Sequence, residues 1–248
     1  MRSTHMLTQR LNRLLGDRAF YSLLALDHGL TYGHSEATSL PPGGMLESCR
    51  DHLGGFVMNY GIAHALDSWP VRLSLVLQCF GGLLGNSRHQ VATVQQAVVL
   101  DAAAVAVQLS WSDSEIGPRM REISAFTADA HSAGLPVLYM LGGECRIKDL
   151  PRSIRVCQEM GANLIKINCS TDRFLADEIA VTDALRNGPP TLMAGGATTS
   201  DIFQLAQNAA QLGFSGYCIG RNIFSAEDPS SVVARLNTIF STKREGVK

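Results

Sequence analysis

The sequence is poor in charge, and neither sign accumulates in any stretch. Its 21 Lys and Arg residues are nearly balanced by 22 Asp and Glu residues, so the net charge is −1 at pH 7. A protein that binds nucleic acid through the phosphates needs a basic surface. The balance therefore predicts that nucleic acid is not a partner.

Long apolar runs are also missing. The uncharged stretches 73–87 and 102–112 contain Gly, Gln, Ser or Asn, and they are too short or too polar to cross a bilayer. The N-terminus has neither the apolar core nor the small-residue cleavage site of a signal peptide. None of the six cysteines forms a CxxC pair, and several lie in apolar runs where a free thiol packs as a small hydrophobe. These absences predict a cytoplasmic protein that does not associate with membranes.

What the chain does have is a regular alternation of short apolar segments and longer segments of helical period. The expected strands are 21–26, 55–58, 73–79, 103–109, 136–141, 163–168, 190–194 and 216–220. The expected helices are 43–53, 88–100, 113–134, 149–160, 172–186, 199–213 and 228–241. Strands that are apolar almost throughout are typical of a parallel sheet covered by helices.

Eight such units predict an α/β fold, a single (β/α)8 TIM barrel spanning residues 1–248. The first six residues, MRSTHM, are interpreted as vector-derived and are left out of the fold prediction. A doubly wound sheet is the alternative, but it usually has fewer strands and often carries a GxGxxG turn after the first strand, which is absent here. In a TIM barrel the chemistry lies at the C-terminal ends of the strands.

Lysine is scarce, which makes the position of one lysine informative. The four lysines are Lys148, Lys166, Lys243 and Lys248, and Lys166 lies within the apolar segment NLIKIN. Because side chains alternate along a strand, Lys166 shares a face with Leu164 and Asn168 and is expected to point into the barrel. It either extends to the rim or pairs with a carboxylate, or it is an amine of lowered pKa that forms a Schiff base with a carbonyl.

Two further segments offer proton-transfer groups. Asp27 and His28 follow the first strand directly, in LALDHG, where a carboxylate can exchange protons with substrate or can cap a turn. Tyr139 shares a strand face with Val137 and Leu141. If that face lines the barrel interior, the phenol points into the site; otherwise the ring fills the core.

Glycines end the last two strands, in LMAGGATTSD and YCIGRNIF. Gly195 and Gly196 let backbone N–H groups approach an anion, and the helix expected after Thr199 or Ser200 presents its N-terminus to the same anion. Gly220 precedes Arg221, whose guanidinium suits a phosphate. A phosphate site after strands 7 and 8 recurs in TIM barrels.

Taken together, these segments resemble the class I aldolase family that includes archaeal-type fructose-bisphosphate aldolases, autoinducer-2 aldolase-like thiolases and aminodeoxyheptulosonate synthase. LALDHG, GANLIKINCSTD, AGG and IGRNIF resemble four signatures of that family, in the same order. The resemblance implies a TIM barrel, a Schiff base at Lys166, acid–base roles for Asp27 and His28, and a homo-oligomer. It also implies that phosphate binds near the residues Gly195, Gly196, Gly220 and Arg221, and that no cofactor or metal is needed.

The chain departs from the family at one point. The family has a catalytic tyrosine at the end of strand 5, in a pattern such as M-Y-P-R-G, and here Leu141 stands at that position. Tyr139, two residues earlier, is therefore a catalytic candidate, although we expect it to line the barrel interior while Asp27 and His28 transfer the protons.

The predicted function is formation or cleavage of a C–C bond in a phosphorylated ketose, with dihydroxyacetone phosphate as donor or product. The aldehyde partner is left open. One alternative is a metal-dependent aldolase, although the candidate ligands form no HxH or HExxH pattern; these are His28, His34, His52 and His64. The other is a non-catalytic sugar-phosphate-binding protein on an aldolase scaffold.

Overall fold

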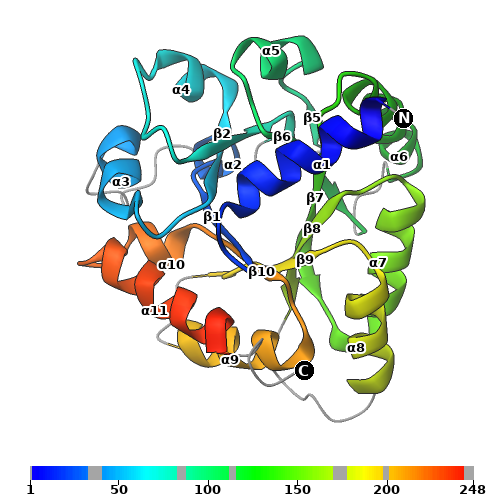
Figure 1. The fold of residues 1–248 in the computed structure, drawn as a ribbon. Coiled ribbons are helices and arrows are strands. Elements are labelled where there is room, and N and C mark those ends of the chain that lie inside the picture. The colour runs from blue at the N-terminus through cyan, green and yellow to red at the C-terminus, as the bar shows by residue number, and fades with distance from the viewer. Residues whose placement is uncertain are drawn as a thin grey trace.

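Eight parallel strands close into a barrel in the computed structural model, which describes residues 2–32, 41–82, 88–111, 116–169, 178–197 and 201–242 (Figure 1). The strands of the barrel are β1 (Tyr21–Ala25), β2 (Gly55–Asn59), β3 (Ser74–Gln78), β6 (Ala104–Ser110), β7 (Val137–Cys145), β8 (Leu164–Cys169), β9 (Thr191–Met193) and β10 (Gly216–Ile219). Each pairs in parallel with the next along the chain, and β1 pairs with β10 to close the ring. The predicted TIM barrel is confirmed, and every predicted strand is present.

The longer helices also occur where helical periodicity predicts them. They are α3 (Pro42–Cys49), α5 (Val94–Val99), α6 (Ile116–Ser132), α7 (Leu150–Glu159), α8 (Glu178–Asn187), α9 (Ile202–Leu212) and α11 (Pro229–Thr242). Helix α5 begins later than expected, because Thr93 and Gln96 form a capping box that fixes its start. The expected helix residues 113–115, 172–177 and 199–200 lie outside the described residues.

Four short elements follow strand ends and were not predicted. Three are single helical turns, α2 (His28–Tyr32), α4 (Tyr60–Ala65) and α10 (Arg221–Phe224), and the fourth is the 3-10 turn η1 (Ile147–Asp149). A small antiparallel hairpin, β4 (Phe80–Gly81) with β5 (His89–Gln90), replaces the start of the helix expected over 88–100. These elements shape the C-terminal mouth of the barrel, because most of them come directly after a strand.

The N-terminal end of the barrel is covered by helix α1 (Arg2–Leu15), which lies across the ring of strands in Figure 1. Leu14 of this helix is fully buried and joins the cluster that fills the barrel interior, with Leu11 and Leu15 packed against it. No helix was expected at this end of the chain, and residues 2–6, which the sequence interpretation left out, form its start.

Two apolar clusters divide the side chains of the strands. The inner cluster fills the barrel and contains Leu138 and Met140 of β7 with Leu164 of β8. The outer cluster lies between strands and helices and contains Ile165 and Ile167 of β8. The expected faces of the strand that carries Lys166 are therefore confirmed.

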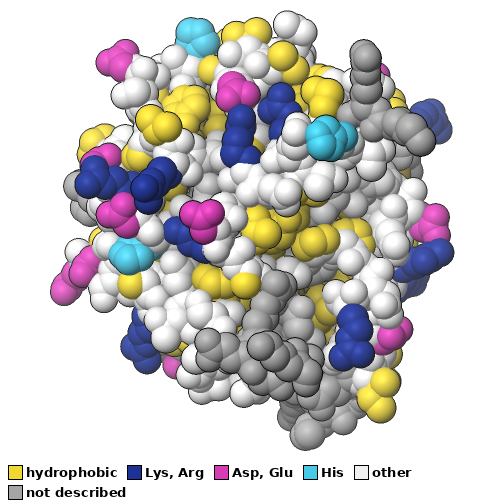
Figure 2. All heavy atoms as spheres, in the orientation of Figure 1, with side chains coloured by type: hydrophobic (Ala, Val, Ile, Leu, Met, Phe, Trp, Pro, Cys, Tyr) yellow, Lys and Arg dark blue, Asp and Glu magenta, His cyan; other side chains and the backbone are white. Residues whose placement is uncertain are grey.

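On the face shown in Figure 2, which α1 crosses, basic and acidic side chains are interspersed. Among the helices that the structure describes, none combines the length and apolar character that a bilayer-spanning segment needs.

Candidate active site

A cavity of about 330 Å³ opens at the C-terminal ends of the strands. It brings together all of the predicted site residues except Tyr139. Its lining comprises Asp27, His28 and Thr31 after β1, Arg88, Gln108 of β6, Met140–Gly143 of β7, Lys166 and Asn168 of β8, Ala194–Gly196 after β9, Cys218 of β10, and Gly220 and Arg221 after it.

Lys166 extends from β8 into this cavity and is partly buried. In the barrel it is flanked by Met140 on β7 and Leu192 on β9, both apolar. Its side chain also reaches the Cys218 thiol of β10: burial raises the pKa of Cys218, and a hydrogen bond with Lys166 acts in the opposite direction. The amine thus lies in the upper layer of the barrel interior, where a substrate carbonyl can approach it from the mouth.

Asp27 is held by groups from three other positions. It is 6% exposed. Its Oδ2 accepts a hydrogen bond from Gln108 Nε2 at 3.3 Å, and its Oδ1 lies 3.8 Å from His28 Nδ1. Its backbone carbonyl accepts a hydrogen bond from Asn59 Nδ2 at 2.9 Å. The carboxylate is therefore fixed toward the cavity and has an amide and an imidazole beside it.

The surroundings of His28 favour its neutral form. Burial lowers its pKa below the ordinary value of 6.5, and the nearby cations Lys166 and Arg221 lower it further, whereas Asp27 acts in the opposite direction. Its ring packs edge-on against Phe224, with centroids 5.3 Å apart. A neutral imidazole can accept a proton as well as donate one.

The glycines after β9 and β10 are required by close packing. A Cβ on Gly220 would lie 2.2 Å from His28 Cε1 and 2.6 Å from the Ala25 carbonyl oxygen. A Cβ on Gly195 would lie 2.9 Å from Ile219 Cγ2. Gly196 has φ of +63°, a conformation that glycine adopts readily. Gly220 therefore packs against the end of β1 and His28, and Gly195 packs against the side chains of Ile219 and Asn222, at distances that leave no room for a side chain.

Asn222 joins these two loops. Its Nδ2 donates to the carbonyls of Gly195 and Ala197, both at 3.0 Å. Arg221, the preceding residue, lines the cavity. The amide thus fixes the loop after β9 relative to the guanidinium after β10.

Tyr139 is not in the site. It is fully buried in the outer cluster, where its hydroxyl donates to the Met160 carbonyl at 2.9 Å and lies 2.8 Å from Thr127 Oγ1 of α6. The expectation that Tyr139 lines the barrel interior was therefore wrong. Leu141 also belongs to the outer cluster, whereas Met140 lies in the inner cluster and pairs with Lys166 in the sheet register. The residue of β7 that lies beside Lys166 is thus a methionine.

Sequence reasoning missed Gln108, Asn168 and Asn222 as site residues. Gln108 carried the signal that had identified Asp27, since it is a polar residue close to the end of an apolar strand. Asn222 could not be found in this way, because its role depends on a loop distant in sequence.

Of the histidines weighed as metal ligands, the three that the structure describes lie on different elements. Of these, His28 lines the cavity, while His52 lies in the turn after α3 and His64 on α4. His34 lies outside the described residues. Within the described residues, no group of three or more His, Cys, Asp and Glu side chains is arranged to hold a metal ion.

Comparison with known proteins identifies the family and supports the barrel fold. The model of a family described as DeoC/LacD family aldolase matches residues 22–226. The chain is 26% identical to a 2-amino-4,5-dihydroxy-6-oxo-7-(phosphonooxy)heptanoate synthase of Streptomyces griseus, over 94% of this chain and 88% of the relative. It is 27% identical to a class 1 fructose-bisphosphate aldolase of Thermoproteus tenax, over 90% of each chain.

The fold is similar to that of an archaeal fructose 1,6-bisphosphate aldolase, with a TM-score of 0.82 at 23% identity over 95% of this chain and 99% of the other. Another structure of equal TM-score and identity is an archaeal aldolase whose catalytic lysine is covalently bound to the carbinolamine intermediate of its substrate.

Proposed function

Since the chain belongs to the DeoC/LacD family of class I aldolases and synthases, we propose that it forms or cleaves a C–C bond in a phosphorylated ketose through a Schiff base on Lys166. Dihydroxyacetone phosphate is the proposed donor or product. The observation that carries the proposal is that Lys166 lines one cavity together with the proton-transfer groups Asp27 and His28 and with the glycine loops that end at Arg221.

The covalent steps follow from an amine in this position. Neutral Lys166 Nζ attacks the ketone carbon, and the oxygen gains a proton to give a carbinolamine. Loss of that oxygen as water leaves an iminium, which can accept the electrons of the bond between its α and β carbons. Removal of the proton from the β-hydroxyl breaks this bond, which releases an aldehyde and leaves an enamine. Protonation and hydrolysis of the enamine return the free amine.

The proton transfers are assigned to Asp27, with His28 beside it. Among the described side chains of the cavity these are the carboxylate and the imidazole, and the lining residues of β7, Met140–Gly143, carry no hydroxyl. Gln108 donates to Oδ2 of Asp27, and we assign proton exchange with the substrate to Oδ1, a buried oxygen beside His28. General acid–base catalysis by a positioned side chain contributes roughly 10²–10⁴-fold to a rate.

The phosphate is assigned to the loops after β9 and β10. Gly195, Gly196 and Gly220 allow backbone N–H groups to approach an anion, and the Arg221 guanidinium can donate two parallel hydrogen bonds to a phosphate. The phosphate held there would position the carbonyl carbon for attack by Lys166.

Borohydride trapping tests the proposal. Reduction in the presence of dihydroxyacetone phosphate should leave one adduct, on the tryptic peptide 156–173 that contains Lys166. The adduct should be absent in Lys166→Met and present in the matched control Lys148→Met. EDTA should not reduce its yield.

Three results would contradict it. An adduct on Lys148 would show that Lys166 is not the nucleophile. Loss of activity in EDTA that added metal restores would favour the metal-dependent aldolase. Saturable binding of ketose phosphates with no adduct would favour the non-catalytic sugar-phosphate-binding protein.

A further inference from the structure

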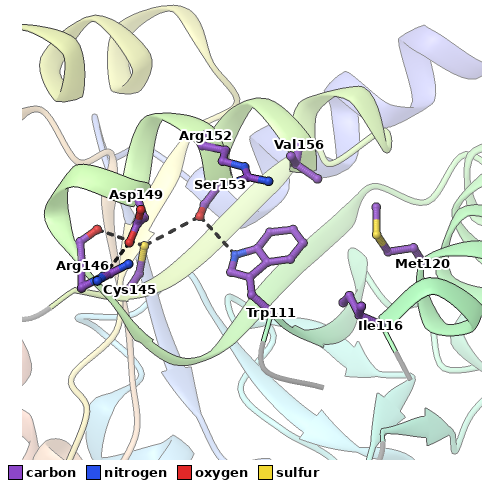
Figure 3. A pocket seen from close by; sticks show the side chains of 9 residues that line it. All are labelled: Trp111, Ile116, Met120, Cys145, Arg146, Asp149, Arg152, Ser153 and Val156. Carbon is purple, nitrogen blue, oxygen red and sulfur yellow. Dashed lines mark hydrogen bonds and ion pairs between the residues drawn. The ribbon is translucent and has the colours of Figure 1, made fainter. Parts of the chain in front are cut away.

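A second and larger cavity, of about 600 Å³, lies beside the active site at the end of β7 (Figure 3). Gly142 and Gly143 of β7 line the active site, whereas Cys145, at the end of the same strand, lines this second cavity. Its other walls come from Trp111 after β6 and from α6 and α7. Small-molecule sites in proteins have volumes of about 300–1,000 Å³. The cavity is large enough for a ligand and is separate from Lys166.

One wall is a fixed aromatic surface. Trp111 Nε1 donates to Ser153 Oγ of α7 at 3.1 Å, and Ser153, which is buried, also lies 3.8 Å from the Cys145 thiol. Trp111 is nevertheless 39% exposed. A tryptophan whose polar atom is already bonded presents a flat apolar face, and such a face binds ring systems.

The walls facing the indole are apolar. Ile116 and Met120 extend from α6, and Val156 extends from α7, as Figure 3 shows. Methionine adapts its shape to ring systems and contacts them favourably. The cavity therefore offers a ring an aromatic surface on one side and aliphatic groups around it.

Among the lining residues that the structure describes, the charged side chains sum to a positive charge. Arg146 Nε is bonded to Asp149 Oδ2 at 2.7 Å, so these two charges cancel. Arg152 of α7 lines the same cavity, and no ion pair with it is found among the described residues. One guanidinium thus stands beside the apolar walls, able to donate two parallel hydrogen bonds to a carboxylate or a similar anion.

We propose that this cavity binds a flat, mostly apolar molecule that bears one anionic group. Its ring lies against Trp111, and its anion is bound by Arg152. This assignment does not depend on the chemistry proposed for Lys166.

Tryptophan fluorescence can test the site directly, because the chain has only two tryptophans. Trp69 packs against Phe56, and Trp69→Phe leaves Trp111 as the sole emitter. In this variant we would titrate 4-nitrobenzoate, a flat anionic quencher, and compare it with the neutral analogue 4-nitrobenzyl alcohol. The expected result is saturable static quenching, with the anion bound about tenfold or more tightly than the alcohol, as for a charge-assisted hydrogen bond.

Arg152→Gln should remove the preference for the anion. The matched control is Arg155→Gln on the same helix, whose guanidinium is paired with Glu159; it should retain the preference. Quenching that never saturates and is equal for both compounds would overturn the proposal, as would equal losses in the two arginine variants. Trp111 emission that shifts with protein concentration while quenching disappears would assign the surface to a second copy of the chain instead.

Discussion

Tyr139→Phe separates a structural phenol from a catalytic one. The substitution removes one hydroxyl from a fully buried position between β7 and α6, where it contacts the Met160 carbonyl at 2.9 Å and Thr127 Oγ1 at 2.8 Å. A net hydrogen bond contributes about 1 kcal/mol, and a buried partner left unpaired costs roughly 1–3 kcal/mol. We expect the free energy of unfolding to fall by roughly 2–3 kcal/mol, which lowers Tm by about 4–12 °C in a domain of this size.

Catalysis should not change, because the phenol lies outside the barrel interior. Burial also raises the pKa of Tyr139 to about 12, so the hydroxyl stays protonated over the working range of pH. The assay combines thermal unfolding by circular dichroism with turnover and borohydride trapping at a temperature where both proteins are folded. We expect a lower Tm, full trapping and unchanged kcat.

Thr127→Val removes the same contact from the α6 side. If the two hydroxyls stabilise the fold through each other, the double variant should lose less than the sum of the single losses. The reasoning would be refuted if Tyr139→Phe kept the Tm of the parent but lost turnover while trapping persisted. That result would place the phenol in the proton transfer.

Three further predictions concern the active site. Gln108→Leu removes the N–H that Asp27 accepts, and we expect kcat to fall roughly 10- to 100-fold while borohydride trapping persists; an unchanged kcat would show that the contact does not position the carboxylate. Arg221→Ala should weaken binding of dihydroxyacetone phosphate by roughly 10- to 100-fold and leave dihydroxyacetone unaffected, whereas equal losses for both would mean that the loop is structural only. The pKa of His28 should lie below 6.5 by NMR titration, because burial disfavours its charged form. Because the pKa of His28 is then higher in the unfolded chain, its contribution to the free energy of unfolding is fully present above pH 6.5 and is lost as the pH falls toward the pKa of the folded state. A titration midpoint above 6.5 would show that attraction to Asp27 outweighs burial.

The strand of Lys166 could be oriented from sequence, whereas the strand of Tyr139 could not. In NLIKIN the polar Lys166 and Asn168 alternate with Ile165 and Ile167, so the two faces differ in chemistry. In VLYML both faces are apolar, and alternation alone shows which residues share a face but not which face is inside. Tyrosine fits the outer position because α6 offers a hydroxyl partner, Thr127, that no local pattern encodes.

The barrel itself was predictable because eight buried strands repeat one pattern along the chain. The short helices after β1, β2 and β10 were not, because one helical turn is too short to show a periodicity. The contact of Asp27 with Gln108 spans 81 positions, and the Asn222 contacts link two separate loops. Such partners depend on the closed ring of strands, which a linear pattern does not describe.

Helix α1, which lies across the N-terminal end of the barrel, bears on two properties that mutations often change together, thermal stability and the geometry of the site around Lys166. Leu14 of α1 packs into the barrel interior, whereas no residue of α1 belongs to the described lining of either cavity. The fit is close, because a Cβ on Gly54 would lie 2.2 Å from the Leu14 carbonyl oxygen. The helix and the strand ring are thus fitted to each other at the end opposite to the mouth. Substitutions in α1 should therefore change thermal stability through packing at the N-terminal end of the barrel, since α1 contributes no residue to the described lining around Lys166. A carrier protein fused ahead of α1 would likewise be attached at the end of the barrel opposite to the cavity that Lys166 lines.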